Sequence, residues 1–244
     1  MTATQLWLVR HGESTANVLA TEAQRAGLEV IAVEHRDADV PLSEAGMRQA
    51  EALGHWLSSA GTAPETVWSS PYLRARQTIA MALDGSGLER PIFVDERLRD
   101  RELGILDTLT SHGVDVRLPD EAARRRWLGK FYYRPPGGES WTDVVLRVRS
   151  FLRDADSVSG DGPILIAAHD AVVMVFLYVC LGWSEQELLD FISTHTVLNA
   201  SVTRLSRDLE SSRWTLEVFA HDDHLENLGA PVTRHGSDSD VQPR

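Results

Sequence analysis

Short apolar runs of strand length alternate with longer stretches of helical periodicity along most of the chain. Four of these runs predict strands: Gln5 to Val9, Thr66 to Ser70, Pro91 to Val94 and Ile164 to Ala168. The last of the four contains only apolar residues, as expected for a strand that is buried on both faces of a parallel sheet.

Helical patterns fill the gaps between these strands. Ser43 is a candidate N-cap ahead of an apolar stripe that begins at Met47. The strongest helical period runs from Trp141 to Ala155, and Ser140 with Asp143 forms a capping-box arrangement at its start. Further helices are expected over residues 14–27, 71–85, 120–130, 170–181 and 184–191, and a loop over 108–118.

The order of these elements indicates an α/β fold. Two later segments, Ser201 to Leu205 and Trp214 to Phe219, alternate polar and apolar residues like strands at the edge of a sheet. The whole order predicts a three-layer sandwich, in which a mainly parallel central sheet carries helices on both faces. Residues 1–228 are expected to form a single domain, and the polar residues 229–244 a disordered tail.

Composition narrows the range of partners and compartments. The chain of 244 residues has 24 Lys and Arg against 36 Asp and Glu, a formal net charge of −12, so we expect no binding to nucleic acid or to an anionic membrane. The single cysteine, Cys180, fits a reducing compartment. The N-terminus lacks a signal-peptide pattern, and His169-Asp170 interrupts the run from Ile164 to Leu181, so a membrane span is not expected. The predicted location is the cytoplasm.

Polar groups stand directly after each of the four predicted strands. They are Arg10-His11, the turn from Ser70 to Arg74, the run from Arg97 to Glu102, and His169-Asp170. A single group of this kind fits an ordinary turn as well as it fits a functional site. Because the carboxyl ends of parallel strands meet at one edge of the sheet, four groups together predict a site there.

The side chains at this edge suit phosphoryl transfer better than metal binding. A metal site needs converging His, Cys or carboxylate ligands, and arginine would repel the ion. Arginine forks match the oxygens of a phosphoryl group, a neutral histidine can attack phosphorus, and a second histidine can stabilise the developing charge. A carboxylic acid can then protonate the departing oxygen. We therefore expect a site without a metal or another cofactor, acting on a small phosphorylated substrate.

Several motifs follow one another in a fixed order from Leu6 to about Leu225. They are Arg10-His11-Gly12-Glu13-Ser14 with Asn17, Pro41-Leu42-Ser43 with Gly46, Gln49 and Ala50, Ser70-Pro71-Tyr72-Leu73-Arg74-Ala75-Arg76-Gln77-Thr78, Pro136-Gly137-Gly138-Glu139-Ser140, and the apolar strand that ends at His169. This ordered set resembles the histidine phosphatase superfamily, in its phosphoglycerate mutase-like branch.

The resemblance implies an α/β sandwich fold and a covalent phosphohistidine on His11. It further implies that Arg10, Arg74 and His169 hold the phosphoryl oxygens, with help from Asn17. These roles are expectations about this chain.

The chain departs from the pattern of this branch at the proton donor. The branch usually has a Glu two residues after the Leu of the third-strand motif, and alignment on Leu98 and Gly104 puts Asp100 there. Glu102 is a nearby alternative. Asp170 is a third candidate, because His-Asp resembles the acid phosphatase branch, in which that Asp is the donor; it could also simply cap a helix. We favour Asp100.

These observations favour a phosphatase that hydrolyses a phosphomonoester through His11. A phosphoglycerate mutase is the alternative, since the insertion between Gly104 and Pro135 is long like that of a mutase. A non-catalytic protein that binds a phosphorylated ligand is a third hypothesis. The identity of the substrate and the oligomeric state are left open, with a homodimer as one option.

Overall fold

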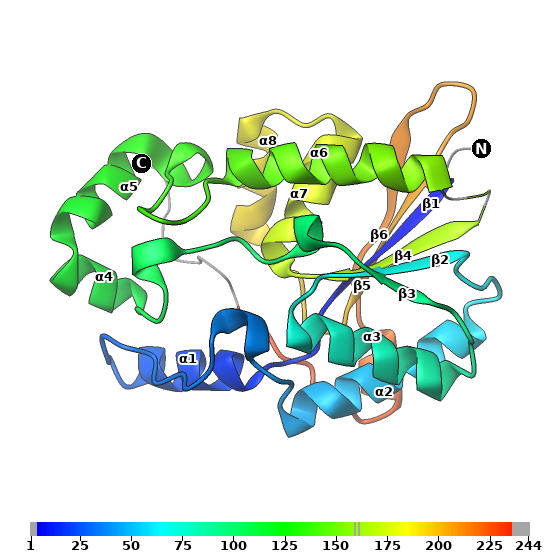
Figure 1. The fold of residues 1–244 in the computed structure, drawn as a ribbon, viewed down its shortest axis with the longest axis horizontal. Coiled ribbons are helices and arrows are strands. Elements are labelled where there is room, and N and C mark those ends of the chain that lie inside the picture. Colours follow the sequence, from blue (N-terminus) through cyan, green and yellow to red (C-terminus); the bar gives the residue numbers. More distant parts are fainter. Residues whose placement is uncertain (1–3, 159, 161, 236–244) are drawn as a thin grey trace.

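A mixed six-stranded sheet lies at the centre of the molecule, as a computed structural model of residues 4–158, 160 and 162–235 describes it (Figure 1). The strands follow the order β3-β2-β4-β1-β5-β6 across the sheet. Their bounds are β1 Gln5–Arg10, β2 Thr66–Ser69, β3 Ile92–Val94, β4 Pro163–Ala168, β5 Val202–Arg207 and β6 Trp214–His221.

The register of the strands brings the predicted site residues to one edge. β1 and β2 both pair in parallel with β4, and β3 pairs in parallel with β2. Arg10 is opposite Ala168 and Ser69 is opposite Ala167, so β1, β2 and β4 end side by side. Only β5 runs against its neighbours, β1 and β6. The predicted mainly parallel sheet is therefore confirmed.

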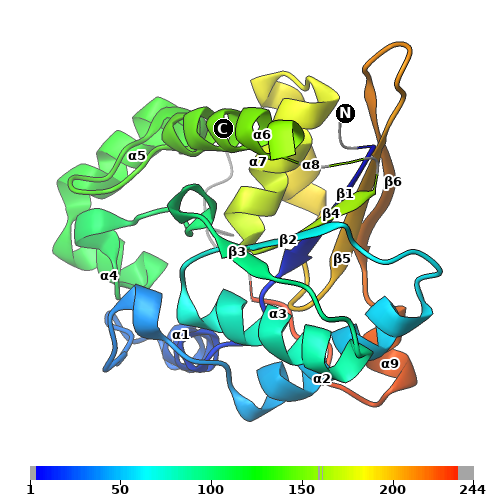
Figure 2. The same ribbon diagram turned by 45° about the vertical axis from the view of Figure 1, so that its right-hand side comes forward.

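Helices cover both faces of this sheet, which confirms the predicted three layers (Figure 2). One face carries α6 Trp141–Val158, α7 Asp170–Leu181 and α8 Glu185–Thr194. The other side carries α1 Thr15–Arg25, α2 Glu44–Ser59, α3 Leu73–Ser86 and α9 Asp223–Asn227. Beyond the carboxyl edge lie α4 Ser111–Arg117 and α5 Pro119–Tyr132. No helix in these described ranges is long and apolar enough to cross a membrane.

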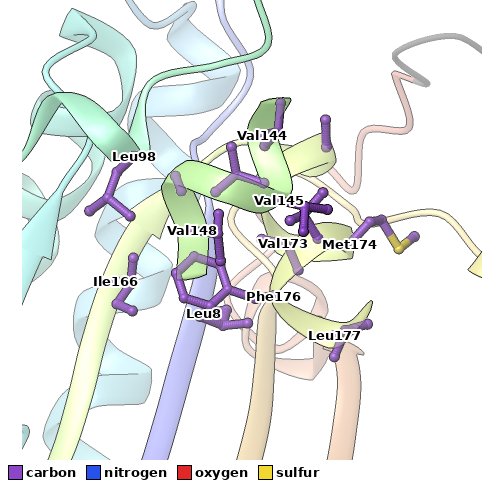
Figure 3. Close-up of a cluster of buried hydrophobic side chains, with 14 of the residues drawn as sticks. Leu8, Leu98, Val144, Val145, Val148, Ile166, Val173, Met174, Phe176 and Leu177 are labelled. Carbon is purple, nitrogen blue, oxygen red and sulfur yellow. The ribbon is translucent and has the colours of Figure 1, made fainter. Parts of the chain in front are cut away.

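The core has two parts because successive side chains of a strand point to opposite faces. Leu8 and Ile166 pack with Val148 and Phe176 on the side of α6 and α7 (Figure 3). Trp7, Val9 and Leu165 pack on the other side, against Leu53 of α2 and Ile79 of α3. All six residues of β4 are buried, as the purely apolar run predicts. Burial of each large aliphatic side chain contributes roughly 1.5–3 kcal/mol.

The predicted helix starts are confirmed by their capping bonds. Ser14 and Asn17 form a reciprocal capping box at α1, and Ser43 Oγ accepts the N–H of Gly46 at α2. Ser140 and Asp143 exchange the corresponding bonds at α6. Met47, however, is exposed, so the apolar stripe of α2 begins only one turn later.

Residues 108–118, expected to be a loop, contain α4. Thr110 caps this helix by accepting the N–H of Gly113, and its hydroxyl donates to the carbonyl of Leu28. Gly113 approaches the backbone of Glu29 so closely that a Cβ would lie 1.9 Å from the Glu29 carbonyl oxygen. The helix has seven residues and Val114 is its one buried large apolar side chain, so its sequence shows little helical period.

Residues 229–235 belong to the fold, in contrast to the disordered tail predicted from residue 229. The buried Gln49 donates from Nε2 to the carbonyl oxygen of Pro231 and to Oγ1 of Thr233. Ala230 is buried against Leu225. The remainder of the predicted tail, 236–244, lies outside the described residues, and the single domain over 1–228 stays a prediction.

Candidate active site

Four charged or ionisable side chains converge where β1, β2 and β4 end. Arg10 is the last residue of β1, His11 follows it, His169 follows β4, and Arg74 lies in the first turn of α3. All four are buried. The rings of His11 and His169 have their centroids 5.1 Å apart, and Arg74 Nε donates to His11 Nε2 over 3.3 Å. The structure thus brings together the residues that the sequence predicted for the site.

A close backbone contact fixes the turn that carries His11. The N–H of His11 continues the sheet by donating to the carbonyl of Ala168, and the N–H of Gly12 donates to Oγ1 of Thr78. A Cβ on Gly12 would lie 2.7 Å from the carbonyl oxygen of Gly46, and one on Gly46 would lie 2.0 Å from that of Glu13. Glycine at both positions therefore lets the turn rest directly on the start of α2.

His11 is held in the form that a nucleophile needs. Its Nδ1 lies 2.7 Å from the carbonyl oxygen of Gly12. Because a carbonyl oxygen only accepts, we assign the proton to Nδ1, which leaves the lone pair on Nε2. Burial lowers the pKa of His11 well below 6.5, and the charge of Arg74 lowers it further. His11 is therefore neutral at neutral pH, with its free nitrogen beside Arg74.

His169 is equally neutral and presents a nitrogen without a hydrogen-bond partner. Burial and then the charge of Arg74 lower its pKa well below 6.5. Its Nε2 lies 2.8 Å from Oγ of Ser70. Its buried Nδ1 makes no hydrogen bond to the described residues, although Oδ2 of Asp100 lies 3.3 Å away. A buried polar atom is costly to leave unpaired, so this nitrogen is suited to a bound oxygen.

Arg10 and Arg74 differ in how their donors are used. Arg10 donates from Nη1 to the carbonyl of Val197, and its Nε is a second buried atom without a hydrogen bond to the described residues. Arg74 donates from Nη1 to the backbone carbonyl and to Oδ1 of Asp37, at 2.6 and 2.9 Å. Its Nη2 contacts Oδ2 of Asp37 at 3.4 Å and Oδ2 of Asp100 at 3.3 Å.

The three candidate acids occupy different places in the site. Oδ2 of Asp100 lies 3.3 Å both from Arg74 Nη2 and from His169 Nδ1. Glu102 is half-exposed and accepts from the hydroxyl of Tyr72 over 2.8 Å. Asp170 lies 3.8 Å from Arg10 Nη1 and is the first residue of α7, whose N-cap is His169. Asp170 is therefore no N-cap, and of the three Asp100 contacts both Arg74 and His169.

A cavity of about 250 Å³ opens over these residues. Arg10, His11, Arg74 and the three candidate acids line it, and Asn17 lines it as well. Oδ1 of Asn17 accepts the N–H of Ser14, so this residue both caps α1 and faces the cavity. In the part of the chain that the structure describes, no group of three or more His, Cys, Asp or Glu side chains could hold a metal ion.

Asp37 and His235 are polar residues of the cavity wall that were not predicted for the site from the sequence. Asp37 reaches Arg74 from a 3-10 helix over Asp37–Asp39, and burial raises the pKa of its carboxyl although Arg74 opposes the rise. His235 lies in the segment predicted to be disordered, with Nε2 at 2.8 Å from Glu13 Oε2 and Nδ1 at 2.7 Å from Thr21 Oγ1. No pattern distinguishes Asp37 from Asp39, two positions later in the same charged run.

Comparisons with known proteins agree with this geometry. The family model of the histidine phosphatase superfamily (branch 1) matches residues 6–221. A 2,3-bisphosphoglycerate-dependent phosphoglycerate mutase from Methylobacterium radiotolerans is 30% identical over 222 residues, which cover 85% of this chain and 98% of that protein. The 6-phosphofructo-2-kinase/fructose-2,6-bisphosphatase 1 of Rattus norvegicus is 28% identical over 241 residues, and the match covers 98% of this chain but 46% of that protein.

A solved structure has the same fold. Mycobacterial glucosyl-3-phosphoglycerate phosphatase in complex with VO3 superposes with a TM-score of 0.72 at 28% sequence identity, covering 90% of this chain and 100% of that one. The predicted family is confirmed: the chain belongs to branch 1 of the histidine phosphatase superfamily.

Proposed function

We propose that the protein hydrolyses phosphomonoesters through a phosphohistidine on Nε2 of His11. The observation that carries the proposal is the bond from His11 Nδ1 to the carbonyl of Gly12, which leaves Nε2 unprotonated and turned toward Arg74. The solved relative named as a phosphatase supports hydrolysis as the outcome.

In the first step the phosphoryl group lies among Arg10, Arg74 and His169. Its oxygens take the unpaired Nδ1 of His169 and Nε of Arg10 as donors, together with Nε and Nη2 of Arg74, while Asp37 keeps its bonds to Nη1. The lone pair of His11 Nε2 attacks phosphorus, the bond to the ester oxygen breaks, and Asp100 gives its proton to the departing alcohol. The arginines and His169 stabilise the charge on the transferring group.

In the second step water attacks the phosphohistidine. The bond between phosphorus and Nε2 breaks, and the carboxylate of Asp100, now ionised, accepts a proton from the water. Inorganic phosphate leaves, and His11 returns to its neutral form. Asp100 fits both proton transfers because its Oδ2 lies between Arg74 Nη2 and His169 Nδ1, at 3.3 Å from each.

The assignment of the acid is tested by the leaving group. p-Nitrophenolate departs without protonation, whereas the alkoxide of glycerol needs a proton. Asp100→Asn is therefore expected to reduce kcat on glycerol 3-phosphate far more than on p-nitrophenyl phosphate, with Glu102→Gln and Asp170→Asn as the comparison variants. If Glu102→Gln or Asp170→Asn shows this pattern instead, the donor is that residue.

A phosphoglycerate mutase is the second candidate function, because the relative from Methylobacterium radiotolerans is named as one. A mutase returns the phosphoryl group to the bound product, whereas a phosphatase passes it to water. If the enzyme isomerises 3-phosphoglycerate faster than it releases phosphate from it, the mutase is favoured. If it releases phosphate from p-nitrophenyl phosphate without isomerising 3-phosphoglycerate, the phosphatase is favoured. Tight phosphate binding without turnover would point to a binding protein.

The composition supports two further proposals. The net charge of −12 suits a small phosphorylated substrate and disfavours nucleic acid or a membrane surface as partner. The single cysteine suits the cytoplasm, and burial raises its thiol pKa to about 12, as expected for a packing residue. A homodimer stays one option for the assembly.

A further inference from the structure

Asp37 pairs with the Nη1 end of Arg74, next to the Nε that faces His11. Its carboxylate accepts from Nη1 at 2.9 Å and approaches Nη2 at 3.4 Å, and its backbone carbonyl accepts from Nη1 at 2.6 Å. This is the two-pronged geometry by which arginine binds carboxylate or phosphate. The guanidinium that is to hold the substrate is thus already paired within the protein.

Carboxylates balance or outweigh the positive charge around the phosphoryl position. The two histidines are neutral, so Arg10 and Arg74 carry the positive charges of the cradle. Asp37 and Asp100 contact Arg74, and a third carboxylate, that of Asp170, lies 3.8 Å from Arg10. A phosphoryl dianion would therefore depend on short bonds to the two guanidinium groups and to the unpaired Nδ1 of His169.

The cavity continues the same charge pattern next to Arg74. Asp107 also lines the cavity, close to Asp37. Burial raises the pKa of Asp107, and the negative charge of Asp37 raises it further. Two more arginines, Arg101 and Arg125, line the cavity near Tyr133, on the side of α5. Positive charge therefore lies toward α5, and negative charge lies beside Arg74. Because Asp100 is the proposed donor to the leaving oxygen and shares Arg74 with Asp37, we expect the first atoms of the leaving alcohol next to these carboxylates.

Much of the remaining wall is apolar or small. It comprises Ala16, Ala20, Ile31, Val33, Leu109 and Val114. These side chains can contact an uncharged group of the substrate, but they provide no positive charge to pair with an anionic group. A carboxylate attached close to the ester would lie among Asp37, Asp107 and Glu102, and like charges in a partly buried site repel strongly.

We infer that this site selects phosphomonoesters whose alcohol carries no negative charge near the ester, and that Asp37 is the residue that rejects the anionic ones. The inference rests on the proposed phosphatase function and adds the class of substrate to it. Asp37 determines specificity from the cavity wall and takes no part in the proton transfers.

Glycerol 3-phosphate and 3-phosphoglycerate form a matched pair for the test, because a hydroxymethyl group in the first replaces a carboxylate in the second. At pH 8 we expect the ratio of kcat/KM for glycerol 3-phosphate to that for 3-phosphoglycerate to exceed about tenfold. Asp37→Asn should lower this ratio by about tenfold or more, chiefly through KM for 3-phosphoglycerate, since the repulsion acts on bound substrate and transition state alike.

Asp39→Asn is the matched control. Asp39 lies in the same 3-10 helix but pairs with Arg36, and it does not line the cavity. Its replacement should leave the ratio unchanged. A general loosening of the loop would alter both substrates in parallel and so would not change the ratio.

The outcomes separate this inference from the proposed function. If p-nitrophenyl phosphate is hydrolysed but the wild-type enzyme prefers 3-phosphoglycerate, or Asp37→Asn leaves the ratio unchanged, the inference is wrong and the phosphatase function stands. If no ester is hydrolysed, the proposed function fails. The Kd values of the two esters, measured by calorimetry for wild type and Asp37→Asn, then still decide whether the cavity rejects the carboxylate.

Discussion

The hydroxyl of Ser70 lies 2.8 Å from Nε2 of His169, and it joins the end of β2 to the end of β4. Ser70 Oγ accepts the N–H of Tyr72, and among the described residues its own hydrogen has no acceptor other than Nε2 of His169, so we assign the hydrogen to that bond. A neutral His169 then carries its proton on Nδ1, the buried nitrogen that faces Asp100 and lacks a hydrogen bond. Ser70 thereby sets the tautomer with which His169 can donate to a phosphoryl oxygen.

Ser70→Ala is expected to lower kcat on p-nitrophenyl phosphate by about tenfold or more, because His169 loses the bond that orients its donor. Steady-state kinetics and the midpoint of urea unfolding measure the two effects separately. Ser69→Ala is the control, because the hydroxyl of Ser69 donates to the backbone carbonyl of Ser70 and, among the described residues, makes no hydrogen bond to either histidine. Equal losses of kcat in the two variants would contradict the role given to Ser70.

Gly46→Ala is expected to abolish most of the activity, by about a hundredfold, through displacement of His11. The new Cβ would lie 2.0 Å from the carbonyl oxygen of Glu13, a backbone atom that moves only if the turn behind His11 moves. Gly85→Ala is the control within α3, where the nearest atom would be 3.8 Å away, and helix propensity predicts a gain of roughly 0.4–1 kcal/mol in stability. Full activity in a folded Gly46→Ala protein would overturn this account of the turn.

The stability of the protein is expected to fall as the pH falls below 6.5. Burial lowers the pKa of His224 to about 4 from an ordinary value of 6.5. Below pH 6.5 the unfolded chain therefore binds more protons than the folded one, so stability present above that pH is lost on acidification. For His224 alone the loss between pH 6.5 and 4 is about 3 kcal/mol.

Urea unfolding at several pH values measures this loss. His224→Gln retains a donor for the carbonyl of Ala200, which His224 Nε2 now contacts at 3.0 Å, and should make the dependence on pH clearly shallower. The exposed His55, replaced by Gln, should leave the dependence as it is. An unchanged slope in His224→Gln would show that this histidine titrates normally in the folded protein.

Deletion of residues 229–244 is expected to lower the free energy of unfolding by roughly 1–3 kcal/mol. The buried Nε2 of Gln49 would lose both of its acceptors, Pro231 and Thr233, and Glu13 would lose His235. A chain that ends at His235 keeps all these contacts and serves as the control. Equal stability of both shortened chains would contradict the structural role of this segment.

The sequence predicted the parts of the site that lie on regular, buried elements. β1 and β4 are apolar enough to be recognised, and their ends place Arg10, His11 and His169 at one edge by the geometry of parallel sheets. Arg74 follows from the turn after β2 in the same way. Local pattern and tertiary structure agree most closely at β1 and β4, because these two strands are buried on both faces.

The parts that were missed depend on contacts between segments far apart in the chain. Asp37 acquires its position from Arg74, and no local feature separates it from Asp39. Residues 229–235 have few apolar side chains and are held by polar contacts to Gln49 and Glu13. α4 is short, and it packs so closely on the backbone of Glu29 that only glycine fits at position 113.

The central claim is the covalent intermediate on His11, and trapping it is the most direct measurement. The enzyme is mixed rapidly with a phosphomonoester labelled in its phosphoryl group, quenched in alkali and digested. We predict label that is stable in alkali and lost in acid, on the peptide that contains His11, with none in His11→Asn. Label on another residue, or hydrolysis by His11→Asn at the wild-type rate, would contradict the account.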